Sequence, residues 1–467
     1  MSLGSNVLEI DEHRMGWVTF PDGPHFSALL ERKKNSVTVE IIPSPEEAIP
    51  DDILDRPLEG ALEKDGVILL FTDRRGSVEL VGCAPSKIFT QWGSGTSSAV
   101  FTVRYLIFGG NGKTWASIRG LRTIHPSLDV WLHVDNIEQK FLEAAPEGKS
   151  WVQYELSDTT EIPLEGYGDL AIFSYPVTEN VGFQGVSLSS RTELYSRSEG
   201  AFEIAAAFEE HQFFNNLLSI LSASQVAPHE FLVHGTDNPI RLYRGEELSE
   251  PNWCRLVAIG LQNEVQIPRF HDFLVNYRDV GPEGLKKWIE INREFKEGVD
   301  ALVRVFSPFS TGWAGRLVDV AIAFEHIGYK LEQEKPKKER RGNLTFYDCI
   351  QNICMECPQL LYRRPEKWAD ALRITYRGVK HANRPNPPLE DIIKTTEVGI
   401  NVLRIWFCHR LGVAQSIEDH WWNRLALFYP WFWPPAQGDD ADERSNWFMG
   451  AEDFAHPHRQ IEPDSLT

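Results

Sequence analysis

The stretch from Arg373 to Pro385, RITYRGVKHANRP, contains the residues of this chain best suited to chemistry. Because a helix brings residues four apart onto one face, we expect Arg373, Arg377 and His381 to lie side by side. Arg384 follows near the end of the same stripe. Histidine exchanges a proton near neutral pH, and arginine is a permanent, forked cation that suits phosphate. Together these residue types indicate phosphodiester chemistry.

The charge around this stretch contrasts with the rest of the chain. The 467 residues include 47 Lys and Arg against 67 Asp and Glu, a formal net charge of -20. Residues 363–384 nevertheless contain seven Lys or Arg, Lys380 among them, against two acidic residues. A second basic cluster, 335–341, lies upstream in an expected loop. Such local patches on an acidic protein favour a confined polyanion site, although a solvated basic helix face is the simpler interpretation.

The elements that would position these residues are helical. From about residue 282 apolar residues recur at the three-and-four spacing of amphipathic helices, which predicts helices over about 285–306, 317–331 and 344–361. Pro365 suits the first turn of a fourth helix, which should end near Arg384 because the residue before Pro385 avoids helical dihedrals. A fifth helix follows Pro388. Short loops between these helices predict an all-α bundle over 282–413.

The first half of the chain has a different period. Short runs rich in Val, Ile, Thr, Phe and Tyr alternate with Gly, Pro, Asp and Ser, which is typical of strands and turns. Over 1–240 we expect a β-rich domain, sandwich or barrel-like. The predicted fold is α+β and multidomain, with 241–281 as a connecting segment and 414–467 as an aromatic segment and acidic tail. The expected strands are 36–42, 66–72, 77–82, 99–108, 151–156, 169–175, 185–194 and 230–233, with a helix over 202–222.

The six cysteines do not predict a disulfide scaffold in so long a chain. Cys354-x-x-Cys357 could be imagined as part of a zinc site with Cys408 and His409. However, Cys349 and Cys357 continue the apolar stripe of a helix, which favours core packing, so we expect no metal. No apolar run is long enough to span a bilayer, and the first residues lack a signal-peptide pattern. We therefore expect a cytoplasmic protein without a membrane partner.

Four motifs carry a family resemblance. SLDVWL at Ser127–Leu132 is similar to an "LDEWL" signature, and a helical stretch follows at Glu209–Ala223. AIAFEH at Ala321–His326 is similar to the glutamate-bearing helix of HEPN domains, and RGVKH at Arg377–His381 to their arginine-to-histidine motif. In this order, from about residue 14 to 412, the chain resembles the ApeA family of bacterial anti-phage proteins. The resemblance implies a β-rich N-terminal domain followed by an all-α HEPN ribonuclease domain.

The resemblance also implies an activity, a metal-independent endoribonuclease with no cofactor. Arg377 and His381 would be the catalytic pair. His381 would move the proton of an RNA 2′-hydroxyl, and Arg377 would stabilise phosphoryl charge. The products would carry 2′,3′-cyclic phosphate ends. Auxiliary or RNA-binding candidates are Arg373, Lys380, Asn383, Arg384 and Glu325.

The spacing of the pair departs from the family pattern. HEPN ribonucleases usually place four to six residues between arginine and histidine, commonly with a polar residue after the arginine. Here three residues separate Arg377 from His381, and Gly378 follows the arginine. Either the helix is deformed at this glycine, which permits unusual dihedrals, or the site no longer cuts. The alternative function is therefore a catalytically degenerate HEPN scaffold that dimerises and binds RNA or nucleotide.

The resemblance finally implies partners. HEPN sites are generally composite, so we expect a homodimer or a dimer of dimers. The expected substrate is RNA, with tRNA as the first candidate, cleaved in anti-phage defence by abortive infection. A phage-derived trigger is expected to act on the β-rich domain.

Overall fold

The computed structural model divides into two compact units. The first comprises Met1–Asp129, Val134–Gln212 and Ala227–Val265, and the second comprises Val130–His133, Phe213–Val226 and Gln266–Thr467. The structure describes residues 6–20, 23–44, 49, 67–90, 97–109, 118–133, 136–142, 151–164, 170–180, 186–241, 247–259, 267–307, 312–357 and 365–413.

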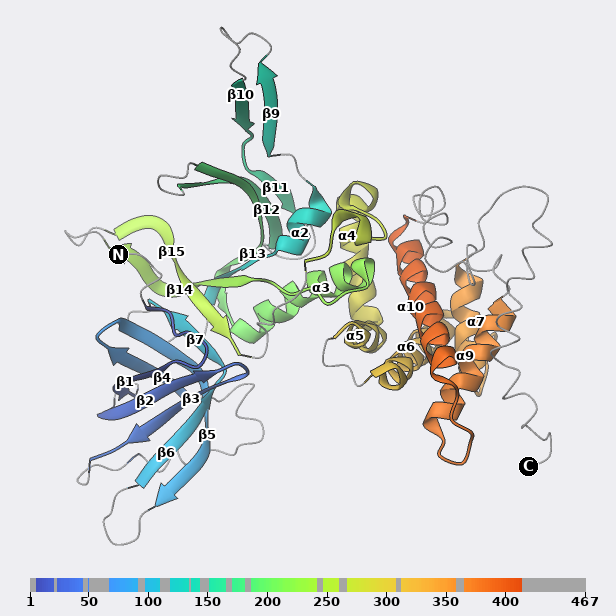
Figure 1. Cartoon of the computed structure of the whole chain (residues 1–467), viewed down its shortest axis with the longest axis horizontal. Helices are drawn as coiled ribbons and strands as arrows, with labels where there is room; N and C mark the ends of the chain where they lie inside the picture. The colour runs from blue at the N-terminus through green and yellow to red at the C-terminus, as the bar shows by residue number, and fades with distance from the viewer. Residues whose placement is uncertain are drawn as a thin grey trace. The chain divides into compact units, whose positions relative to one another are not determined.

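Six strands of the first unit close into a barrel (Figure 1). They are β1 (His13–Thr19), β2 (His25–Lys33), β3 (Ser36–Ile42), β4 (Val67–Asp73), β5 (Gly76–Thr90) and β6 (Ser97–Val103). They pair antiparallel in the order β5, β4, β1, β2, β3, β6, and β6 also pairs with β5. This closure leaves the barrel without a free edge.

Alternation along the strands fills the barrel. In β3, Val37, Val39 and Ile41 are buried while the residues between them are partly exposed, as expected when successive side chains point to opposite faces. Phe71 and Phe101 from other strands are fully buried in the same core. The barrel therefore has a packed interior.

The sheet continues beyond the barrel because β5 also pairs with β7 (Tyr105–Phe108). The further strands are β8 (Ile118–Ile124), β11 (Thr160–Pro163), β12 (Leu170–Asn180), β13 (Val186–Phe202), β14 (Glu230–Arg241) and β15 (Glu247–Ala258). From β7 their order is β15, β14, β8, β13, β12, β11, all antiparallel. A separate hairpin pairs β9 (Ile137–Leu142) with β10 (Trp151–Leu156).

The first half of helix α3 (Ile204–Ser222) packs on the extended sheet. Its buried His211 forms hydrogen bonds with Thr123 of β8, at 2.9 Å, and with Ser196 of β13, at 2.7 Å. Phe208 packs edge-on against Phe231 of β14. One face of the extended sheet is thus covered by a helix.

The second unit is helical (Figure 1). Its helices include α4 (Tyr277–Glu294), α5 (Lys296–Val305), α6 (Gly312–Glu334), α7 (Phe346–Glu356), α9 (Pro365–Lys380) and α10 (Leu389–Leu411), with the short α2 (Pro126–Leu132) and η4 (Phe270–Asp272). Two glycines let helices approach α6 closely. A Cβ on Gly328 would lie 2.4 Å from Cys349 of α7, and one on Gly399 of α10 would lie 2.5 Å from Val320. Helix α6 is therefore at the centre of the packing.

The second half of α3 belongs to this helical unit because α10 binds its end. The buried Arg404 of α10 donates from Nε to the Ile220 carbonyl, at 2.7 Å, and from Nη2 to the Leu221 carbonyl, at 2.6 Å. A cation is favourable at a helix C-terminus, where carbonyl groups lack helical partners. Trp288 of α4 adds a 2.6 Å hydrogen bond to the Phe213 carbonyl.

The order of a β-rich region followed by a helical region confirms the predicted α+β multidomain fold. Three details differ. The segment expected to connect the domains contains strand β15, which joins the sheet. The helix expected over 285–306 is broken at Phe295, which ends α4 and begins α5. The fourth helix ends at Lys380 rather than near Arg384.

Two further predictions concern the C-terminal segment and the membrane. The aromatic segment and acidic tail expected over 414–467 lie outside it. Among the described residues, no helix is both long and apolar enough to cross a membrane.

Candidate active site

Helix α9 has one buried face, and this face orients the basic one. Trp368, Leu372 and Tyr376 are at most 5% exposed. The Trp368 ring lies 6.2 Å from Phe324 of α6, and the Tyr376 ring lies 5.1 Å from Phe346 of α7. The neighbouring face carries the arginines, which are half-buried.

The helix runs without interruption through Gly378. The backbone N–H of His381 donates to the Arg377 carbonyl at 3.1 Å, which is the bond of a regular helical turn. The helix deformation at Gly378, one of the two explanations offered for the short spacing, is therefore not present in this turn. Arg377 is half-buried and His381 is exposed, one turn further on.

Gly378 instead allows a loop to fold back onto the helix. A Cβ at this position would lie 3.0 Å from the Pro387 ring and 3.1 Å from the Pro385 carbonyl oxygen. The loop between α9 and α10 thus packs directly against the turn that carries the pair. Sequence patterns alone do not reveal this contact.

Two auxiliary candidates lie in that loop. Asn383 and Arg384 are exposed, and the Arg384 N–H donates to the His381 carbonyl at 3.0 Å. The turn that follows α9 therefore holds both residues beside His381, on the solvent side.

Arg373 lies on the same helix but has a local partner. Its Nη2 and Nε donate to Asp370 Oδ1 at 2.7 and 3.1 Å. Both side chains are about one-fifth exposed, so solvent weakens the pair. A polyanion that approached Arg373 would have to compete with this carboxylate.

Glu325 and Lys380 come together across α6 and α9. The Lys380 amine lies 5.1 Å from the Tyr376 ring centre. Its pKa is raised, first by a hydrogen bond with Tyr376 and also by the charge of Glu325. The half-buried Glu325 is therefore within electrostatic reach of the last turn of α9.

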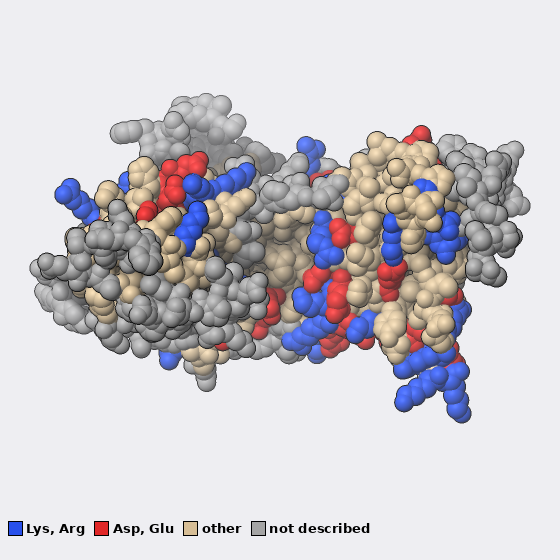
Figure 2. All heavy atoms as spheres, turned by 90° about the horizontal axis from the view of Figure 1, so that it is seen from below, with Lys and Arg blue, Asp and Glu red and all other residues tan. Residues whose placement is uncertain are grey.

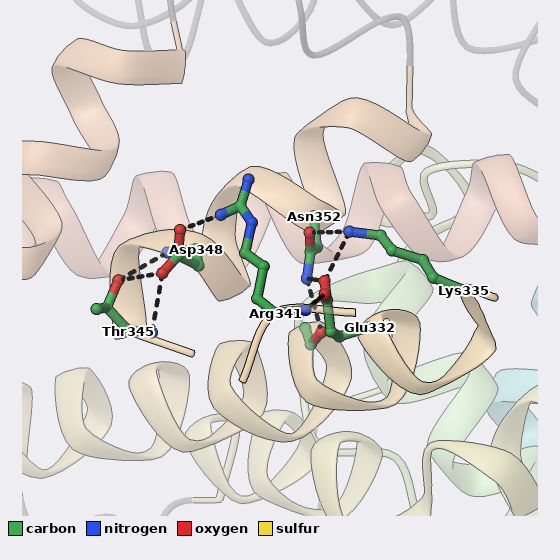
Figure 3. Close-up of polar contacts among 7 residues, drawn as sticks. Glu332, Lys335, Arg341, Thr345, Asp348 and Asn352 are labelled. Carbon is green, nitrogen blue, oxygen red and sulfur yellow. Dashed lines mark hydrogen bonds and ion pairs between the residues drawn. The ribbon is translucent and has the colours of Figure 1, made fainter. Parts of the chain in front are cut away.

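The second basic cluster forms a structured loop between α6 and α7 (Figure 3). The buried carboxylate of Glu332 accepts from Lys335 Nζ at 2.6 Å, from Asn352 Nδ2 at 3.0 Å and from the Arg341 N–H at 2.6 Å. The hydrogen bond from Lys335 is the largest cause that lowers the pKa of Glu332, to about 2. This buried acid was not anticipated from the sequence, because polar residues adjoin it at Gln333, Glu334 and Lys335.

The basic residues of this loop differ in their partners. Arg341 pairs with Asp348, and Arg340 donates from Nη1 to Gln333 Oε1 at 3.0 Å. Lys337 and Lys338 are exposed and form no ion pair with any described residue. Figure 2 shows one face of the molecule, on which Lys and Arg side chains gather, some of them next to acidic ones.

The cysteines are part of the core. All six are reduced and buried. Burial is the largest cause that raises the pKa of the Cys349 thiol, to about 11, and of the Cys408 thiol, to about 12. Within the described ranges no group of three or more His, Cys, Asp or Glu side chains could hold a metal ion.

Comparison with known proteins identifies the first unit. The family model described as ApeA N-terminal domain 1 matches residues 13–288, which is more than half of the chain. The match covers the barrel, the extended sheet, α3 and the start of α4. No curated protein and no solved structure matches.

Proposed function

Because the chain belongs to the ApeA family, which points to anti-phage defence, we propose that its helical unit is a HEPN endoribonuclease acting as a defence effector. Its substrate is cellular RNA, and tRNA is the first candidate. The observation that carries the proposal is the helical turn that sets Arg377 and His381 on one face at the end of α9.

The geometry of this turn supports a division of labour. His381 is solvent-exposed, so its imidazole can reach a 2′-hydroxyl of bound RNA. Arg377, one turn earlier, is half-buried and presents guanidinium donors to phosphoryl oxygens. The attack of the 2′-oxygen on phosphorus expels the 5′-oxygen and leaves a 2′,3′-cyclic phosphate. We propose that Arg377 and His381 promote this step without a metal ion.

The surrounding residues support binding of a polyanion. Lys380, Asn383 and Arg384 extend the face beyond the pair, and Lys337 and Lys338 add cations from the α6–α7 loop. Because the chain has a net charge of -20, these residues confine the attraction of a polyanion to the helical unit. Glu325 lies within electrostatic reach of Lys380 at the end of the helix.

We further propose that the site is completed by a second copy of the chain. One exposed histidine and one half-buried arginine offer few donors to a phosphate. Two such faces about a two-fold axis would double them. A homodimer is the smallest assembly with this property, and a dimer of dimers would also have it.

The alternative function is a scaffold that binds RNA or nucleotide without cleaving it. The three-residue spacing between Arg377 and His381 favours this alternative, as do the regular helical turn at Gly378 and the ion pair that Arg373 forms with Asp370.

An assay in phage-infected cells distinguishes RNA cleavage from binding without cleavage. In phage-infected bacteria that express wild-type protein, we expect tRNA fragments and fewer plaques. His381→Ala should lower fragment yield by about a hundredfold or more, the usual contribution of a general acid-base group. His13→Ala, at an exposed histidine of β1, is the matched control and should behave as wild type. Wild-type cleavage by a folded His381→Ala protein would refute the enzymatic proposal.

A further inference from the structure

The β-rich unit contains a pocket of about 1080 Å³ that RNA cleavage by the helical unit does not use. Residues of β8, β11, β12, β13 and β14 line it. Pockets that enclose small ligands commonly measure roughly 300–1,000 Å³. The pocket is therefore large enough for a ligand of nucleotide size or somewhat larger.

Three arginines line this pocket, Arg119 and Arg122 of β8 and Arg197 of β13. Residues an odd number of positions apart normally face opposite sides of a strand. Here the pairing of β8 with both β13 and β14 shifts register around Arg119, and such a bulge re-aims a side chain. The irregularity explains how Arg119 and Arg122 line the same pocket.

The three arginines all affect the pKa of the neighbouring His234 of β14. Burial is the largest cause that lowers its pKa, and all three arginines lower it further. Each of the three guanidinium groups disfavours protonation of this imidazole, so all three lie close enough to His234 to act on it. The pocket is therefore a place of positive potential in an acidic protein.

The guanidinium of Arg122 is held in place by aromatic rings. It lies 4.1 Å from the ring centre of Trp253 and 5.1 Å from that of Tyr195, which is cation-π geometry. Its Nη1 lies 3.7 Å from Glu193 Oε2. Its buried Nε has no hydrogen-bond partner among the described residues. An anionic oxygen in the pocket would offer this fixed cation the acceptor that it lacks.

Two acidic residues, Glu161 and Glu193, line the pocket with the three arginines, which leaves a net positive charge. Glu193 is 3% exposed and accepts a 2.5 Å hydrogen bond from the Tyr175 hydroxyl, besides its pairing with Arg122. Arg119 and Arg197 are exposed and form no ion pair within the described part of the unit. Two cations thus remain available to a ligand.

Aromatic side chains form a wall beside the arginines. The Tyr195 ring lies 5.3 Å from Phe173 and 5.6 Å from Trp253. Gly120 makes room for the indole, because a Cβ there would lie 2.8 Å from Trp253 Cη2. Of these rings, Phe173 and Tyr195 line the pocket, nearly perpendicular to each other, and present aromatic surface beside the arginines.

We propose that this pocket binds a nucleotide, with its phosphates on the arginines and its base against the aromatic wall. Forked guanidinium groups suit phosphate oxygens, and aromatic faces stack bases of any sequence. An acidic peptide would use the same charges but has no need of the aromatic rings. The combination of the two features therefore favours the nucleotide.

Calorimetric titration of the full chain tests the ligand class. The probes are ATP, GTP, CTP, UTP and the dinucleotide ApA, with inorganic triphosphate and hexaglutamate for comparison. We expect saturable binding of at least one nucleotide. Inorganic triphosphate should bind roughly tenfold more weakly or worse, because it has no base to stack. Absence of binding by every nucleotide overturns the proposal, as does equal or tighter binding of triphosphate or hexaglutamate.

Variants locate the ligand. Arg122→Gln and Arg197→Gln should each weaken binding by roughly tenfold or more, through loss of a charged contact. Arg74→Gln, at an exposed arginine in the β4–β5 turn of the same unit, should leave it unchanged. His381→Ala should also bind as wild type, so the outcome does not depend on RNA cleavage. Thermal melts identify any variant that is unfolded, and Arg197, being exposed, keeps the test valid if Arg122→Gln fails to fold. Wild-type binding by folded arginine variants overturns the proposal.

Discussion

At the residue scale, the turn from Arg377 to His381 depends on a neighbour with no side chain. Gly378 is buried in the same turn, with the Pro385–Pro387 loop packed against its Cα. Glycine normally weakens a helix by about 1 kcal/mol relative to alanine. Its presence here is explained by close approach of the loop rather than by unusual dihedrals.

We predict that Gly378→Ala destabilises the protein despite this gain in helix propensity. The new Cβ would meet a proline ring at 3.0 Å and a carbonyl oxygen at 3.1 Å, and neither can swing away. Overpacking of this kind costs about 1–3 kcal/mol, which exceeds the gain of about 1 kcal/mol. A lower unfolding midpoint in denaturant measures the net loss.

Gly342→Ala provides the matched control, because a Cβ there meets nothing within 4 Å. We expect no comparable loss for this variant. A Gly378→Ala protein more stable than wild type would contradict the close packing of the loop.

At the element scale, the α6–α7 loop is organised by one buried carboxylate. Glu332 binds Lys335, Asn352 and the backbone of Arg341 at once (Figure 3). The acid thereby fixes the loop that presents Lys337 and Lys338. Charge-assisted hydrogen bonds in a buried setting stabilise more than exposed pairs do.

We predict that Glu332→Gln destabilises the protein at neutral pH by about 1.5–3 kcal/mol, the usual range for hydrogen bonds to a charged group. The pKa of Glu332 is lowered to about 2, so the carboxylate stabilises the fold above its ordinary pKa and loses this effect as pH falls toward 2. The difference between variant and wild type should therefore shrink below about pH 4.5. Denaturant titrations at pH 7 and pH 3 measure it, and a difference that grows in acid would contradict the assignment.

Some elements could be predicted from the sequence because local signals agree with tertiary packing. Pro365 and the apolar stripe of α9 indicated the helix that carries Arg377 and His381. Strand β8 was not expected, because Gly120 and two arginines interrupt its apolar pattern. In the fold, the glycine makes room for Trp253 and the arginines line a pocket. The residue types at such positions are determined by contacts with residues distant in sequence, and the periodicity of the sequence does not predict these contacts.

The candidate site shows the same division. Spacing of four correctly predicted that Arg377 and His381 share a helical turn. It did not indicate that Arg373 binds Asp370 or that a loop packs on Gly378. These contacts depend on side-chain geometry and on the return of the chain after α9.

At the scale of the whole molecule, the chain joins an ApeA β-rich unit to a helical unit with a concentrated basic face. The proposed composite site predicts complementation between inactive variants. Arg377→Ala and His381→Ala should each be inactive alone. In a mixed dimer, one site pairs the intact arginine of one subunit with the intact histidine of the other.

We expect equimolar mixing of the two variants to restore roughly a quarter of wild-type RNA cleavage. Random exchange makes about half of the dimers mixed, and the composite site of each mixed dimer keeps one arginine of two and one histidine of two. Co-purification of differently tagged subunits verifies the exchange. No restoration in verified mixed dimers would mean that the two residues act within one subunit.

The most direct test of the central claim is end-group analysis of RNA cleaved by the purified wild-type protein in excess EDTA. The account predicts tRNA fragments with 2′,3′-cyclic phosphate and 5′-hydroxyl ends, because Arg377 and His381 suffice for attack by the 2′-oxygen. His381→Ala protein should yield none. Cleavage that requires a divalent cation and leaves 3′-hydroxyl and 5′-phosphate ends would contradict the account.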